Sequence, residues 1–146
     1  MAKEIRSYRD LDAWQVTIRL TERVYQSVIR LPATERFRLS AQMRRASVSV
    51  PSNIAEGQAC GSDGRYIHHL RIACGSLGEL NTHVEIARRL AMLPDSVLAE
   101  LEEHLARTGQ VLHGLLRSRL LKRGRVTRSA FLAGFCLWLL SLANLG

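Results

Sequence analysis

Few side chains in this 146-residue chain are spaced so that they could do chemistry together. Two Glu–His pairs are four residues apart, Glu79 with His83 and Glu100 with His104. Di-iron sites inside helical bundles use a Glu-x-x-His spacing of three residues, so neither pair fits. His68 and His69 are neighbours and would point about 100° apart on a helix, which disfavours joint chelation. Because the chain also has no glycine-rich phosphate loop, we expect a protein that is not an enzyme and that binds no metal and no cofactor.

The side chains best suited to an external ligand are two adjacent arginines, Arg44 and Arg45. Guanidinium groups favour bidentate contacts with phosphates and carboxylates. Two interpretations stay open: the pair contacts nucleic-acid phosphates, or it forms ion pairs with Glu56 or Glu79, within or between protomers. The net charge of +8 makes nucleic-acid binding plausible, although a composition this rich in arginine can equally reflect GC-rich coding DNA.

Next to the arginines, residues 42–57 read as a helix that contains a proline, Pro51. A proline inside a helix removes one hydrogen bond and crowds the carbonyl four residues earlier, at a cost of about 3 kcal/mol. We therefore expect a kink, with Asn53 and nearby serines bonding the backbone that it exposes. These serines are Ser47, Ser49 and Ser52. Gly57 is expected to end the helix in the left-handed conformation, and Glu56 to pair with an arginine or cap an amide.

Three segments resemble the signature of a known family: Gln42–Gly57, Gly75–Leu80 and Tyr8–Trp14. The most specific part of the first segment is Asn53–Gly57. Its members are small four-helix bundle proteins related to those encoded in bacterial 23S rRNA intervening sequences. The accessory variability determinant of diversity-generating retroelements belongs to the same group. The resemblance extends from Tyr8 to Leu121. It implies a ring-like homopentamer, with RNA, DNA or a reverse transcriptase as partners. The motif residues that it marks are Pro51, Asn53, Glu56, Gly57, Gly75, Ser76 and Glu79.

Residues 10–121 contain four stripes of apolar residues, in which the spacing alternates between three and four positions. The elements that these stripes indicate would position the residues named above. Such stripes predict four α-helices. Thr34 is the expected N-cap of the second helix, Ser62 or Asp63 begins the third, and Asp95 or Ser96 caps the fourth. Short loops at 32–34, 58–61 and 93–95 force neighbouring helices to be antiparallel. We therefore expect an all-α, up-down four-helix bundle over residues 1–121, in which Gly75 and Gly78 permit close helix approach.

Apolar residues also occur off the main stripes. The main stripe of the first helix is Leu11, Trp14, Ile18, Thr21, Tyr25 and Val28. The additional residues are Val16, Leu20, Val24, Leu31, Ile67, Ile72, Ile86, Val97, Val111, Leu116 and Leu120. Second stripes of this kind usually mark an interface between protomers. We therefore expect a homo-oligomer, and the resemblance favours a pentamer.

The tail, residues 122–146, has no counterpart in the family pattern. It begins with Lys122, Arg123, Arg125 and Arg128 and continues as an uncharged, apolar run over 129–146. Three interpretations stay open: a helix that packs on the bundle or the oligomer, a short membrane anchor with a basic flank, or non-native sequence from a shifted reading frame or altered stop codon. The three cysteines are odd in number and unpaired in spacing, and the N-terminus has no signal peptide. We expect a cytoplasmic protein, or one that is membrane-associated through its tail.

Two classes of function remain. The first is a non-enzymatic, oligomeric scaffold that binds RNA, DNA or a reverse transcriptase. The second is a structural or protein-interaction module with no nucleic-acid role. Arg44 and Arg45 are the candidate nucleic-acid contacts.

Overall fold

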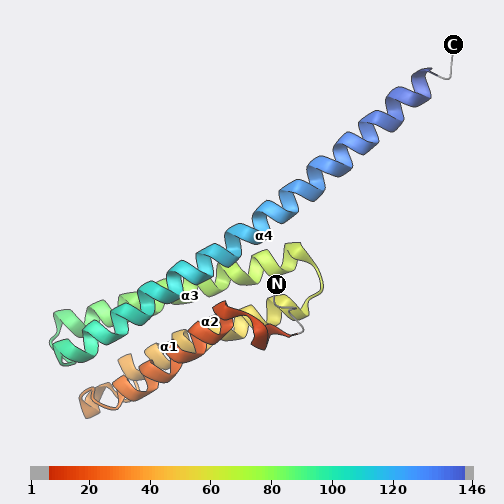
Figure 1. Ribbon diagram of the computed structural model, residues 1–146. Coiled ribbons are helices and arrows are strands. Elements are labelled where there is room, and N and C mark those ends of the chain that lie inside the picture. The colour runs from red at the N-terminus through yellow and green to blue at the C-terminus, as the bar shows by residue number, and fades with distance from the viewer. Residues whose placement is uncertain (1–6, 144–146) are drawn as a thin grey trace.

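The computed structural model describes the backbone of residues 7–143 and the side chains of residues 7–124. Four α-helices follow one another: α1 (Asp12–Val28), α2 (Leu39–Ala59), α3 (Asp63–Arg89) and α4 (Asp95–Ala143). The 3-10 turns η1 (Tyr8–Asp10) and η2 (Ala33–Glu35) precede α1 and α2, and residues 7–143 contain no strand. Successive helices are antiparallel, and α4 returns to pack on α1 (Figure 1). The all-α, up-down four-helix bundle is confirmed.

The helix starts agree with the sequence only in part. The Ser62 side chain caps α3 as predicted, since its hydroxyl accepts a hydrogen bond from the Arg65 amide. The N-cap prediction for Thr34 is wrong, because Thr34 lies inside η2 and α2 begins only at Leu39. The Glu35 carboxylate reaches forward and accepts a hydrogen bond from the Leu39 amide at 3.3 Å. Glu35, which lies one turn before Leu39, thus satisfies one of the free backbone amides at the start of α2.

The core is formed by the predicted stripes of α2, α3 and α4, but α1 is rotated relative to the prediction. Its buried apolar face is Ala13, Val16, Leu20, Val24 and Val28. Tyr25, from the predicted stripe, is 46% exposed. Thr17 and Ser27 can turn inward because each hydroxyl bonds a carbonyl of its own helix.

Part of the proposed protomer interface therefore belongs to the core. Six of the predicted interface residues are buried within one protomer, so they are not interface residues: Val16, Leu20, Val24, Leu31, Ile67 and Val97. Ile72 and Ile86 on the outer side of α3 stay about 40% exposed. These two residues still fit the expectation of a contact between copies.

The last helix extends well past the end of the bundle (Figure 1, blue). In the part of the chain that the structure describes, no helix is long and apolar enough to cross a membrane. The three interpretations of residues 129–146 concern side chains outside the described ones. They stay predictions, as does the division of the chain after Leu121.

Candidate nucleic-acid interface

Pro51 lies inside α2, which continues through it to Ala59. Because proline has no N–H, the carbonyl of Ser47, four residues earlier, loses its helical partner. Thr21, on α1, replaces that partner: its hydroxyl lies 2.9 Å from the Ser47 carbonyl oxygen. The same hydroxyl is 2.9 Å from the Thr17 carbonyl, so its proton is shared between the two acceptors. Sequence reasoning missed Thr21, since only the fold shows that it faces the proline.

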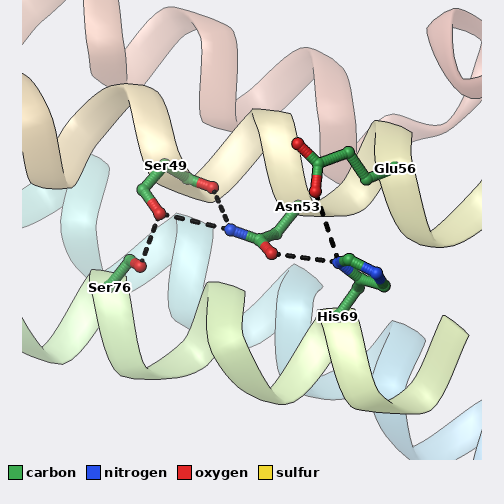
Figure 2. Close-up of polar contacts among 5 residues, drawn as sticks. All are labelled: Ser49, Asn53, Glu56, His69 and Ser76. Atoms are coloured by element: carbon green, nitrogen blue, oxygen red, sulfur yellow. Dashed lines mark hydrogen bonds and ion pairs between the residues drawn. The ribbon is translucent and has the colours of Figure 1, made fainter. Parts of the chain in front are cut away.

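Asn53 joins α2 to α3 through a chain of polar contacts (Figure 2). Its side-chain amide donates to the Ser49 carbonyl at 2.9 Å and to the Ser49 hydroxyl at 3.2 Å. The Ser49 hydroxyl also forms a hydrogen bond with the Ser76 hydroxyl at 2.8 Å, in which either oxygen can be the donor. The Asn53 oxygen lies 3.1 Å from His69 Nδ1 and can only accept, so Nδ1 is the donor in this contact. Asn53 bonds backbone as expected, but not the carbonyl that Pro51 frees.

Within the described protomer Glu56 faces His69, and not the arginine or the backbone amide that the sequence predicted. Its carboxylate lies 3.5 Å from His69 Nδ1 (Figure 2). The cluster does not form a nucleophile–base pair, because Asn53 stands between the Ser49 hydroxyl and the imidazole. Across the described side chains, no group of three His, Cys, Asp or Glu residues could hold a metal ion. What the cluster does in this geometry is hold α2 against α3.

Gly57 lies in the interior of α2 and does not end it, so the prediction of a left-handed terminator is wrong. The glycine with positive φ (68°) is Gly61, in the loop after the helix. A Cβ on Gly57 would lie 2.7 Å from Tyr66 Cδ2 and 2.8 Å from His69 Cβ. Gly57 is thus required because α3 passes too close for any side chain.

Gly75 and Gly78 do not permit close helix approach within the protomer. A Cβ built on either residue would meet nothing within 4 Å, and both are exposed. The prediction that Gly75 and Gly78 permit close helix packing is therefore wrong within the described residues of one protomer. Between them, Ser76 bonds Ser49, so this segment meets the Pro51 segment at the α2–α3 seam.

Arg44 and Arg45 form no ion pair with Glu56 or Glu79 inside the described protomer. Twelve residues of helix, about 18 Å, separate Arg44 from Glu56. Glu79 instead lies 3.5 Å from His83 Nε2. The Arg44 guanidinium lies 5.7 Å from the centre of the half-exposed Tyr25 ring, and Arg45 is exposed. Pairing within a protomer is thus excluded, while pairing between protomers stays a prediction.

The two arginines belong to a larger group at the end of the bundle where α1 turns into α2. The group, which we call the basic end, consists of Arg30, Arg36, Arg38, Arg44 and Arg45. Residues 28–45 contain one acidic side chain, Glu35. The rest of residues 1–121 carries twelve basic and twelve acidic side chains. The net charge of +4 over residues 1–121 therefore comes entirely from the basic end. Counting charged residues in successive segments of the sequence would have revealed this cluster.

The basic end also contains a cleft of about 340 Å³ between the end of α1 and the start of α2. Arg36 and Arg44 line it together with apolar side chains of the turn. The α1–α2 turn leaves Ile29 and Phe37 76% and 84% exposed. The basic end thus combines guanidinium groups, a cleft and exposed apolar side chains. Sequence reasoning named Arg44 and Arg45 here and missed the other three arginines and Phe37.

Comparisons with known proteins agree with the bundle. Residues 9–114 match the family model described as 23S rRNA-intervening sequence protein. Among solved structures, the chain is similar to a protein of unknown function from the S23 ribosomal protein family of Bacteroides thetaiotaomicron. That likeness has a TM-score of 0.67 at 18% sequence identity and covers 72% of this chain and 95% of the other. No curated protein matches the chain. On the family model, the chain belongs to the 23S rRNA-intervening sequence protein family.

Proposed function

We propose that the protein is a non-enzymatic, self-associating helical scaffold that binds nucleic acid at its basic end. The observation that carries this proposal is the placement of charge: five arginines around one carboxylate, on a bundle that is otherwise neutral. The one carboxylate is engaged with the backbone amide that begins α2. Guanidinium groups that are not neutralised by acidic neighbours are the usual contacts for phosphates.

Self-association would multiply this surface. Val48, Ile72 and Ile86 leave apolar area exposed on α2 and α3, and Gly75 and Gly78 leave room for close approach by a neighbour. We propose that copies of the chain meet through this face, as a pentamer. Light scattering at about micromolar concentration tests this assembly, and a strict monomer would remove it.

Fluorescence anisotropy of the full chain with a labelled strand of about 16 nucleotides tests nucleic-acid binding. The measurement is made at about 50 and 200 mM salt, because log K falls by roughly 0.7–0.9 per phosphate neutralised for each tenfold rise in salt. The tail contributes the same background in every variant, so differences between variants report on the bundle.

The decisive variant is the double substitution Arg44→Gln and Arg45→Gln. Its matched control, Arg19→Gln with Arg107→Gln, removes the same charge from exposed positions on α1 and α4, away from the face proposed for self-association. We expect the Arg44/Arg45 variant to bind several-fold more weakly than the control and to have a shallower salt dependence. Equal affinities for the two variants would refute the basic end as the site. If the wild-type chain does not bind nucleic acid, the remaining function is that of a protein-interaction module. A reverse transcriptase is then one candidate partner.

A further inference from the structure

The most exposed large apolar side chain in the described part of the chain is an aromatic ring at the centre of the basic end. Phe37 is 84% exposed, and arginines lie on both sides of it in sequence. A phenyl ring left in water costs free energy that burial elsewhere would recover. No contact within the described protomer covers this ring, apart from one guanidinium group.

That guanidinium belongs to Arg36, whose Cζ lies 5.4 Å from the centre of the Phe37 ring. Arg36 also lines the cleft of the basic end, so it links the ring to the cleft. Arg44, which also lines the cleft, makes a similar contact with Tyr25. Two aromatic rings, Phe37 and Tyr25, therefore each lie against an arginine that lines the cleft.

We propose that Phe37 is a stacking platform for an unpaired base, so that the basic end binds single-stranded nucleic acid in preference to duplex. This inference rests on the proposed function and specifies its substrate. Single-strand binding sites combine a basic groove with aromatic rings on which bases stack, and the arginines contact phosphates. A base in a duplex is already stacked between its neighbours, so the same ring has nothing to bind there. Arg36 on one ring face leaves the other face for the base.

The test compares the full chain with three variants: Phe37→Ala, Phe37→Trp and Leu121→Ala. Leu121 is the matched control, since it is 56% exposed and lies on α4 between Arg119 and Lys122. Those two residues line a pocket with the α2–α3 loop, at the end of the bundle opposite the α1–α2 turn. The probes are single strands of oligouridine and oligothymidine, and a duplex of the same number of phosphates. Affinities are measured by anisotropy, and assembly by light scattering.

We expect Phe37→Ala to weaken binding of both single strands by about fivefold or more, which is the loss of one stacked base. Duplex binding should change by less than about twofold, because no charge is removed. Phe37→Trp should restore single-strand affinity, and Leu121→Ala should leave it unchanged.

Two results would overturn the inference while leaving the proposed function in place. In the first, Phe37→Ala leaves single-strand affinity unchanged, or weakens single strands and duplex equally, although the wild type binds. In the second, Phe37→Ala lowers the oligomeric state, which would make the ring a contact between copies. A wild-type chain that binds neither single strand nor duplex would refute the proposed function and, with it, this inference.

Discussion

The contact between Thr21 and the backbone near Pro51 gives a quantitative prediction about how the bundle tolerates a proline in α2. Ser47 is buried, and its carbonyl has no amide partner because residue 51 is proline. The Thr21 hydroxyl replaces the missing amide at 2.9 Å. Its other acceptor, the Thr17 carbonyl, also lies within a continuous helix and has the backbone amide of residue 21 available. Loss of the hydroxyl therefore affects chiefly Ser47.

We expect Thr21→Val to reduce the free energy of unfolding by about 1–3 kcal/mol, the cost of a buried acceptor left without a donor. In a Pro51→Ala background, the new amide at residue 51 can bond the Ser47 carbonyl. The same Thr21→Val change should then cost less than about 1 kcal/mol. The coupling between the two sites is thus predicted to be about 1–2 kcal/mol, within the range seen for residues that share a partner.

The assay is urea unfolding followed by helical circular dichroism, for the wild type, the two single variants and the double variant. All four proteins are compared at one protomer concentration, because the stability of an oligomer depends on concentration. An equal cost of Thr21→Val in both backgrounds would refute the compensation, and so would a cost below a few tenths of a kcal/mol in the wild type.

Three further predictions concern the α2–α3 seam. Gly57→Ala should destabilise the bundle by about 1–2 kcal/mol, since overpacking against Tyr66 and His69 exceeds the gain of about 1 kcal/mol in helix propensity; an unfolding midpoint at or above wild type would contradict the close approach. Asn53→Ala should cost about 1–3 kcal/mol, because Ser49 and His69 lose their shared partner, and a negligible loss in denaturant melts would show that Asn53 is not structural. Burial raises the pKa of Tyr66 above 10.0, so the folded state holds this proton more tightly than the unfolded chain. Stability that is fully present below pH 10 should therefore decline as the pH rises above it, and Tyr66→Phe should reduce this decline in melts at alkaline pH.

The sequence predicts the fold well where a single apolar stripe is unambiguous, as in α3. Tyr66, Leu70 and Ala73 begin a buried series that continues at the predicted spacing. On α1, two sets of apolar positions compete, and intrahelical hydrogen bonds let Thr17 and Ser27 face the core. The pattern of apolar residues does not reveal such hydrogen bonds. The predicted buried face of α1 was therefore wrong by part of a helical turn.

In the candidate site, too, some features follow from the local sequence and others only from how the helices pack. The charge of the basic end is local, and counting residues 28–45 would have found it. The roles of Thr21 and Gly57 depend on which helix lies opposite, at distances that only the packed bundle defines. Gly57 and Gly61 are both plausible helix terminators from sequence. Only the close passage of α3 distinguishes them.

The central claim, that nucleic acid binds at the basic end, is tested most directly by mapping the contact on the full chain. Ultraviolet crosslinking to an oligouridine strand, followed by mass spectrometry of the peptides, locates the bound strand without relying on any substitution. We predict that crosslinks concentrate in residues 28–45, with Phe37 or an adjacent residue among the modified positions. Crosslinks confined to the basic segment 117–128, with none in residues 28–45, would contradict the account.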